Sequence, residues 1–192
     1  MNTVYSEFKK DKETLRQLLI RRAYFREKII LSSGKESDYY IDARLVTLSS
    51  QGAYLCARLI LDLIKNEPID AVGGPTLGAD PLVGALGVLS FQMGKPIDTF
   101  IIRKTPKAHG KGNQVEGPLL KKGSRVALID DVATTGKAFA RSLDVLESMG
   151  VIVKKAICLV DRAEGAKEAL AQRGCALISI LDISEIHPSS PR

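Results

Sequence analysis

The alternation of apolar and polar positions along the 192-residue chain predicts an α/β fold. Apolar residues recur at helical spacing in several segments, and short apolar runs typical of buried strands lie between most of them. We expect helices at residues 14–23, 49–65, 80–93, 137–149 and 164–172. We expect strands at residues 69–72, 98–103, 125–129, 154–160 and 176–181. Because strands and helices alternate, the pattern predicts a mostly parallel sheet flanked by helices.

The N-terminal part of the chain departs from this alternation. Residues 28–31 and 39–42 are expected to be extended on either side of a turn at residues 33–35, as in a hairpin. With the first helix they predict a small hood over residues 1–45, beside an α/β core at residues 46–182. Both belong to a single domain of residues 1–192, and residues 183–192 form a tail. The tail is expected to fray from His187 on, where prolines and serines predominate.

Composition and charge narrow the class of protein. Hydrophobic residues make up 45% of the chain and charged residues 26%, which is ordinary for a globular protein. Cys56, Cys158 and Cys175 stand among apolar residues, which indicates reduced, buried thiols. Since no apolar run is long enough to span a membrane, we expect a cytoplasmic protein with no membrane partner. The net charge of +6 suits an acidic partner, but the scarce aromatic residues argue against nucleic acid.

The strongest chemical signal lies in residues 126–138, VALIDDVATTGKA. An apolar strand leads into Asp130 and Asp131, and small or hydroxylated residues up to Gly136 precede a helix. Small side chains let backbone N–H groups converge on a phosphate, and the start of a helix adds positive potential. Carboxylates suit the vicinal hydroxyls of a ribose, and also a nearby metal ion. The segment therefore predicts a site for a ribose phosphate that bears a leaving group.

Other interpretations of this segment fit less well. A P-loop would need glycine where Asp131 stands and serine or threonine where Ala138 stands. A dinucleotide fingerprint would need three spaced glycines, which this junction lacks. A helix capped by Thr134 or Thr135 after a buried strand would account for a threonine and a glycine. It would not account for two acids at the end of a strand.

A second concentration of charge follows the strand expected at residues 98–103. Arg103, Lys104, Lys107, His109 and Lys111 fall within nine residues of a polar, glycine-bearing loop. A flexible, solvated loop is the usual interpretation of such a run. A reaction that expels diphosphate, however, needs cations that gather around the leaving group and exclude water, and this loop can supply them.

The segment VALIDDVATTGKA resembles the phosphoribosyl-diphosphate (PRPP) signature of type I phosphoribosyltransferases. Three more segments resemble the orotate phosphoribosyltransferase family: ILSSGKESDYYIDAR, like its N-terminal hairpin, IRKTPKAHGKGNQVEG, like its mobile catalytic loop, and LVDR. The matches follow the family's order and spread over nearly the whole chain. The resemblance implies a type I phosphoribosyltransferase fold. It also implies transfer of the phosphoribosyl group from PRPP to orotate, giving orotidine 5-phosphate and diphosphate in UMP biosynthesis.

The resemblance implies roles for particular residues. Catalytic roles are implied for Lys104, Lys107, His109 and Asp131, and contact with orotate for Thr134 and Arg162. PRPP contacts are implied for Arg103, Lys104, Lys107, His109, Asp130, Asp131, Val132, Ala133, Thr134, Thr135, Gly136, Lys137 and Ala138. The implied cofactor is a magnesium ion (Mg²⁺), and no protein side chain is expected to ligate it. A homodimer is also implied, in which Arg103 acts in the site of the neighbouring subunit.

Several positions stay open at this stage. Ser32 stands where many orotate enzymes have lysine, and Leu77-Gly78 where some have Tyr-Lys, so we expect no side-chain role there. Tyr39 and Tyr40 could equally well be packing residues or neighbours of orotate.

Arg162 also has two interpretations, because it can pair with Asp161 or Glu164 as well as with a ligand carboxylate. Two other functions stay open for the whole chain. One is a phosphoribosyltransferase for another base. The other is a PRPP-sensing regulator that binds nucleic acid, although no DNA-reading helix pair or RNA-binding aromatic signature is evident.

Overall fold

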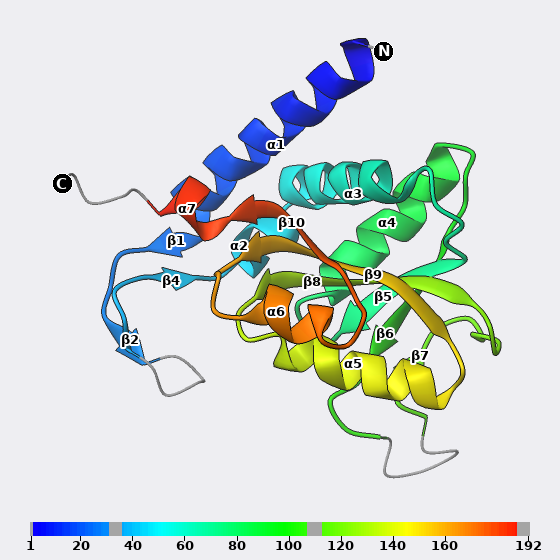
Figure 1. Ribbon diagram of the computed structural model, residues 1–192. Helices are drawn as coiled ribbons and strands as arrows, with labels where there is room; N and C mark the ends of the chain where they lie inside the picture. Colours follow the sequence, from blue (N-terminus) through cyan, green and yellow to red (C-terminus); the bar gives the residue numbers. More distant parts are fainter. Residues whose placement is uncertain (1, 31–35, 107–112, 188–192) are drawn as a thin grey trace.

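The computed structural model describes residues 2–30, 36–106 and 113–187 (Figure 1). The helices are α1 (Asn2–Arg22), α2 (Arg44–Thr47), α3 (Ser50–Ile64), α4 (Asp80–Gln92), α5 (Lys137–Ser148), α6 (Ala166–Ala171) and α7 (Ile183–Ile186). The strands are β1 (Tyr24–Phe25), β2 (Ile29–Ile30), β3 (Glu36–Ser37), β4 (Tyr40–Ile41), β5 (Ala71–Pro75), β6 (Asp98–Ile102), β7 (Val115–Glu116), β8 (Arg125–Ala133), β9 (Ile152–Asp161) and β10 (Leu177–Asp182). No helix of the described part is both long and apolar enough to cross a membrane.

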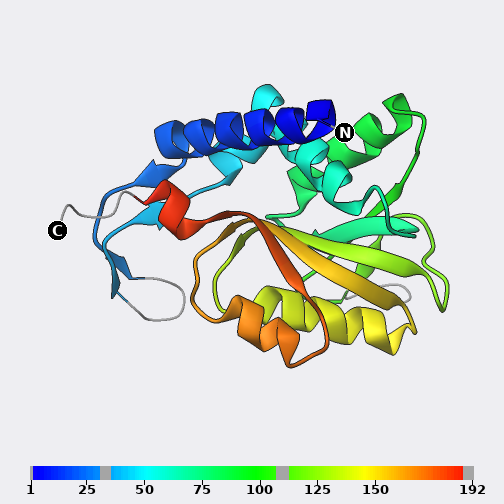
Figure 2. The ribbon, with the colours of Figure 1, turned by 45° about the horizontal axis from the view of Figure 1, so that its top comes forward.

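A six-stranded sheet in the order β10-β9-β8-β5-β6-β7 forms the centre of the described structure. Its strands pair in parallel except for β7, which runs antiparallel to β6. Helices α1, α3 and α4 cover one face, and α5 and α6 cover the other (Figure 2). The predicted α/β fold, a mostly parallel sheet flanked by helices, is confirmed.

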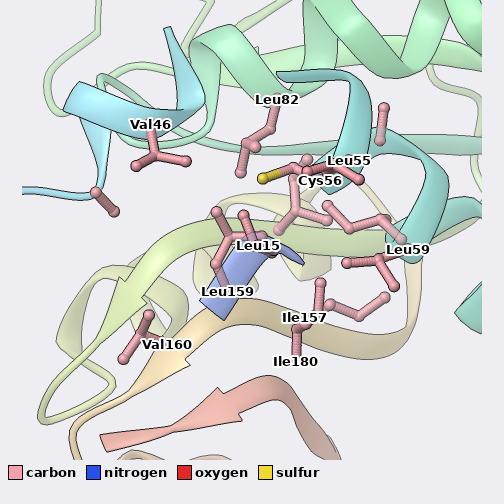
Figure 3. Packing of buried hydrophobic residues seen from close by; sticks show 14 of the residues in the cluster. Leu15, Val46, Leu55, Cys56, Leu59, Leu82, Ile157, Leu159, Val160 and Ile180 are labelled. Carbon is pink, nitrogen blue, oxygen red and sulfur yellow. The ribbon is translucent and has the colours of Figure 1, made fainter. Parts of the chain in front are cut away.

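The hydrophobic core lies on both faces of this sheet, which explains why the strands are apolar at nearly every position. On one face, Leu15 of α1 and Leu59 of α3 pack in a cluster with Ile157 of β9 (Figure 3). On the other face, Phe139 of α5 packs in a second cluster with Leu128 of β8. Each fully buried side chain of this size contributes about 1.5–3 kcal/mol. The two clusters together fix the central strands and therefore the loops at their ends.

The three cysteines behave as the sequence predicts. Cys56, Cys158 and Cys175 are free thiols and all are buried. Burial raises the pKa of each thiol, so the reactive thiolate is disfavoured.

The hood contains the predicted hairpin, but in a different register. One arm consists of β1 and β2, and the other of β3 and β4. Strand β2 pairs antiparallel with β3 instead of with residues 39–42, and β1 pairs antiparallel with β4 next to the first helix. Aromatic pairs explain this register, since Phe25 stacks on Tyr40 with ring centroids 6.3 Å apart. The predicted turn at residues 33–35 lies outside the described residues.

Helix α1 begins at Asn2, twelve residues earlier than the apolar spacing predicts. Its N-terminal half is largely polar, so periodicity gives no signal there. Phe8 packs against the core cluster, and ion pairs add further contacts. The guanidinium of Arg58 on α3 pairs with Glu7 at 3.3 Å and with Asp11 at 2.9 Å.

Five short elements were not predicted, because a helix of four residues or a strand of two has no detectable period: α2, α7, β1, β3 and β7. Helix α7 begins where the tail was expected. It starts with a capping box between Asp182 and Glu185, and Lys12 of α1 pairs with Glu185 at 3.0 Å.

Strand β8 is longer than predicted, because it continues through the two acids to Ala133. Its last residues pair with β9, with Asp130 opposite Cys158 and Ala133 opposite Asp161. The acids therefore lie near the carboxyl end of a central, paired strand, and the loop between this strand and α5 is only three residues long.

Candidate active site

Two cavities open beside the carboxyl ends of β8 and β9, the edge where open parallel sheets bind ligands. The hood cavity, of about 410 Å³, is lined by Ile29, Ile30, Tyr40, Ile41, Asp42, Ala43, Arg44, Leu77, Gly78, Lys104, Asp131, Val132, Thr134 and Arg162. The loop cavity, of about 390 Å³, is lined by Lys104, Asp130, Val132, Ala133, Thr134, Thr135, Gly136, Lys137, Ala138, Phe139 and Arg141. Lys104, Val132 and Thr134 line both, so the cavities adjoin.

The loop cavity has the features of a phosphate site. Helix α5 begins at Lys137, and its first capping bond runs from the N–H of Ala140 to the carbonyl of Gly136, at 2.9 Å. The N–H groups before Ala140 therefore have no partner within the helix. Neither Thr134 nor Thr135 caps the helix, and their hydroxyls make no hydrogen bond to another described residue. These donors are available to an anion at the positive end of α5.

Gly136 is essential to this loop, because its φ of 76° is a left-handed conformation. A Cβ there would also lie 2.8 Å from Cδ1 of Leu170 and 3.2 Å from Cα of Ala166. We expect Gly136→Ala to lower the free energy of unfolding by about 2–3 kcal/mol, measured by chemical denaturation.

Gly123→Ala provides the matched control. Gly123 has a φ of 85°, but a Cβ there would meet no atom within 4 Å. We expect this variant to lose only about 1 kcal/mol, the cost of the backbone conformation alone. Equal losses in the two variants would contradict the close packing of the loop against α6.

Asp130 and Asp131 form the wall between the two cavities. The N–H of Asp131 donates to Oδ1 of Asp130 at 2.9 Å, and the N–H of Val132 donates to Oδ1 of Asp131 at 2.7 Å. Burial raises the pKa of both carboxyls, and the charge of Asp131 raises the pKa of Asp130 further. The N–H of Val132 and the guanidinium of Arg44 oppose the rise for Asp131. Two adjacent buried acids favour a ligand that donates hydrogen bonds or brings a cation.

Gly78, which was given no role from the sequence, closes over these acids. A Cβ at Gly78 would lie 2.2 Å from Oδ1 of Asp130 and 2.4 Å from Oδ1 of Asp131. Only glycine therefore permits the loop after β5 to approach the two carboxyls this closely. Within the described residues, no group of three or more His, Cys, Asp or Glu side chains is arranged to hold a metal ion.

Arg162 follows β9 and points into the hood cavity with only 7% of its surface exposed. Its Nε pairs with Oε1 of Glu164 at 2.9 Å, one of the two partners that the sequence left open. Its Nη2 donates to Oγ of Ser37 at 3.2 Å, and its guanidinium carbon lies 4.5 Å from the ring centroid of Tyr39. Tyr39 therefore packs against Arg162, whereas Tyr40 lines the cavity directly.

The basic loop is anchored at its base by Gln114. The side chain of Gln114 donates to the carbonyl of Arg103 at 2.8 Å and to that of Lys104 at 3.4 Å. Lys104 lines both cavities, but Arg103 lines neither and pairs with Glu116 at 3.7 Å.

The remaining predicted cations of this loop, Lys107, His109 and Lys111, lie outside the described residues. All other predicted site residues except Arg103 are brought together around the two cavities.

Two arginines at the site were not singled out from the sequence. Arg44 lines the hood cavity and makes a two-pronged pair with Asp42, at 2.8 and 3.0 Å. Arg141 lines the loop cavity, and its spacing of four from Lys137 puts both on one face of α5, a signal that was present in the sequence. Arg44 carried no such signal, because it depends on how the hood folds back.

The fold and this site define a ribose-phosphate-binding α/β protein of the type I phosphoribosyltransferase class. Residues 48–183 match the family model described as "Phosphoribosyl transferase domain". An orotate phosphoribosyltransferase of Thermosynechococcus vestitus is 42% identical over 175 residues, which cover 91% of this chain and 92% of that protein. The chain belongs to the orotate phosphoribosyltransferase family.

Solved structures agree with this assignment. The orotate phosphoribosyltransferase of Mycobacterium tuberculosis, solved with Fe(III) dicitrate, superposes with a TM-score of 0.81 at 36% identity, covering 92% of this chain and 98% of that one. The same enzyme solved in complex with PRPP superposes with a TM-score of 0.77 at 34% identity, with the same coverage of each chain.

Proposed function

We propose that this chain transfers the 5-phosphoribosyl group from PRPP to N1 of orotate, giving orotidine 5-phosphate and diphosphate for pyrimidine biosynthesis. The observation that carries the proposal is the position of Arg162. Its guanidinium lines the hood cavity, which adjoins the loop cavity through Thr134 and Val132. A planar guanidinium suits a carboxylate on a flat ring, and orotate carries one.

Binding of PRPP begins with its 5-phosphate in the loop cavity. The unpartnered N–H groups at the start of α5 and the hydroxyls of Thr134 and Thr135 anchor the phosphate. Asp130 and Asp131 accept hydrogen bonds from the vicinal ribose hydroxyls. Binding so far from the reacting bond fixes the sugar with its anomeric carbon toward the hood cavity.

The reaction breaks the bond between the anomeric carbon and diphosphate and forms a bond to N1 of orotate, which gives up its proton. Positive charge develops on the ribose ring as the leaving group departs. The adjacent carboxylates stabilise that charge in a site from which water is excluded. The departing diphosphate is stabilised by the cations of the basic loop, Arg103, Lys104, Lys107 and His109. This loop closes over the site during the reaction and opens again to release the products.

We propose Mg²⁺ as the cofactor, bound together with PRPP. The residues present fit such an ion, since Asp130 is buried beside the partly buried Asp131 and the pKa of both carboxyls is raised. Asp130 and Asp131 would hold the ion near the ribose through their negative charge. When bound, the ion would neutralise negative charge on the departing diphosphate.

We also propose a homodimer in which Arg103 acts in the neighbouring site. A hydrophobic surface, which we call the dimer face, lies on α2, α3 and α4 and includes the exposed residues Leu45, Leu48, Tyr54, Val88, Phe91 and Met93. Leu77, 65% exposed, lines the hood cavity in the loop that leads into α4. A partner on this face therefore lies next to the active site, and Arg103 lines no cavity of its own subunit.

We expect Phe91→Glu to convert the dimer to a monomer and to lower activity by about a hundredfold, because Phe91 is 74% exposed on the dimer face and a charge there opposes burial. Analytical ultracentrifugation measures the mass and the orotate assay the rate. Lys95→Glu, an exposed change beyond the end of α4, is the control and should leave both unchanged. A fully active Phe91→Glu monomer would contradict the shared site.

The remaining features of the protein follow from this function. We propose a single cytoplasmic domain of residues 1–192, with residues 1–45 as a hood that covers the base and residues 46–182 as the core. We also propose that residues 183–192 form a tail to this domain.

A panel of bases tests the proposal. Orotate, uracil, hypoxanthine and adenine are each supplied with PRPP and Mg²⁺, and release of diphosphate is measured. We expect a preference for orotate of at least about a thousandfold, because the other bases lack the carboxylate that Arg162 pairs with. Faster transfer to a base without a carboxylate would make the chain a phosphoribosyltransferase for that base. No transfer, with nucleic-acid binding that falls steeply with salt, would make it a regulator.

A further inference from the structure

An aromatic cluster connects the C-terminal end of the described chain to Arg162. It consists of Tyr24 on β1, Tyr39 in the hood and His187, the residue after α7. The rings of Tyr24 and Tyr39 are stacked with centroids 5.9 Å apart, and the rings of Tyr39 and His187 are 4.9 Å apart. The hydroxyl of Tyr24 and Nδ1 of His187 share a hydrogen bond of 2.5 Å. We call these three residues the aromatic cluster.

The guanidinium of Arg162 is held on three sides. Glu164 pairs with Nε along one edge, and Oγ of Ser37 accepts a hydrogen bond from Nη2. The ring of Tyr39 covers one face, with the guanidinium carbon 4.5 Å from its centroid. Only Glu164 comes from the core, so the hood sets the plane and the tilt of the guanidinium.

Tyr39 has a fixed position because the rest of the aromatic cluster supports it. Oγ of Ser37 donates to the carbonyl of Tyr39 at 2.8 Å, which fixes the backbone of the hood at that point. The ring itself packs on Tyr24 and His187, and burial raises the pKa of its hydroxyl. His187 also lines a cavity of about 360 Å³ together with Arg26, Glu27, Lys28 and Asp38.

His187 is in turn fixed through α7. The capping box at Asp182 starts this helix, and the N–H of His187 donates to the carbonyl of Ile183 at 2.8 Å. Arg16 of α1 donates to the carbonyl of Glu185 at 3.0 Å. The position of His187 is therefore set by α1 and β10, outside the hairpin formed by β1–β4, and Figure 1 shows α7 beside β1.

We propose that Tyr24, Tyr39 and His187 are positioning residues that hold Arg162 in the orientation that accepts the carboxylate of orotate. This inference rests on the proposed function. It makes α7 part of base recognition, although none of the three residues lies in the loop cavity where PRPP binds. A carboxylate and a guanidinium pair best in one plane through two parallel hydrogen bonds, so a tilt of Arg162 weakens the binding of orotate in particular.

The test uses His187→Ala, which removes a ring, and Tyr24→Phe, which removes only the shared hydrogen bond. We expect His187→Ala to raise the KM for orotate by about tenfold and Tyr24→Phe by about threefold to fivefold, on the usual scale of an aromatic pair and a hydrogen bond. The KM for PRPP should change by less than about twofold, since the phosphate site is untouched. His187→Asn, which keeps an acceptor at the position of Nδ1, should recover part of the orotate affinity.

Ser184→Ala is the control, because Ser184 is exposed on α7 outside the aromatic cluster. It should leave both KM values unchanged. Equal changes in the two KM values, a loss of activity that follows a loss of thermal stability, or no change in any variant would each overturn the inference. Absence of turnover in the unaltered chain would instead remove the proposed function and with it this inference, so the two failures are distinguishable.

Discussion

The double variant Asp130→Asn, Asp131→Asn is expected to lose transferase activity by a thousandfold or more while its melting temperature rises by about 3–6 °C. Activity falls because the amides cannot stabilise positive charge on the ribose as carboxylates do, and a thousandfold corresponds to about 4 kcal/mol. Stability rises because burial disfavours both charges and each carboxylate repels the other. Removing the charges gains about 1–2 kcal/mol, which for a chain of this size gives the stated shift.

The pH dependence of the gain follows from the direction of the pKa shifts. Since both folded-state pKa values lie above the unfolded ones, the acids favour folding only while protonated. Their contribution is complete below the unfolded pKa of about 4 and is lost as pH rises through the folded pKa. The melting temperatures of the variant and the unaltered chain should therefore be close at pH 4 and diverge toward pH 7, as followed by circular dichroism.

Asp144→Asn is the matched control, since Asp144 is exposed on α5 and pairs with Arg173. It should change neither activity nor the pH profile of stability. We expect the two acids to serve the reaction while lowering the stability of the folded chain. A double variant that is less stable than the unaltered chain at pH 7 would contradict this.

Arg162→Ala is expected to raise the KM for orotate by about a hundredfold and to leave the KM for PRPP within about twofold. A charge-assisted, two-pronged pair contributes about 2–3 kcal/mol, and tenfold in affinity corresponds to about 1.4 kcal/mol. Arg162→Lys should raise the KM for orotate by about tenfold, since lysine keeps the charge but lacks the planar guanidinium. Initial rates with each substrate varied in turn separate the two KM values.

Arg173→Ala serves as the control for this series. Arg173 also pairs with two acids, Asp144 and Glu147, but these lie toward the C-terminal end of α5, away from the proposed phosphate site at its N-terminus. It should leave both KM values unchanged. If Arg162→Ala raised the KM for PRPP as much as that for orotate, Arg162 would have a general structural role instead of binding the base.

Most of the core could be predicted from the sequence because burial on both faces imposes a clear pattern. Strand β9 and helix α3 are apolar at the positions that face the core, and Ser49 caps α3 through the N–H of Gly52. The first half of α1 could not be predicted, since Phe8 alone gives no period and the ion pairs to Arg58 leave none in the sequence.

The chemistry of the site was predictable where it was local. Asp130, Asp131 and the loop after them are neighbours in sequence, so the sequence alone predicts that they form one ribose-phosphate site. The surroundings of Arg162 were not predictable. Tyr39 and Ser37 reach Arg162, and His187 reaches Tyr39, only after β4 has paired with β1 and α7 has packed against α1. The close approach of Gly78 to the acids likewise depends on the order of β5 beside β8.

The most direct test of the account is the loss of orotate absorbance when the unaltered chain is mixed with orotate, PRPP and Mg²⁺. We expect the absorbance of orotate to fall steadily only when all three compounds are present. One diphosphate should be released for each orotate consumed. We also expect diphosphate with orotidine 5-phosphate to regenerate orotate. Unchanged absorbance in the complete mixture, with a chain shown to be folded and dimeric, would contradict the account.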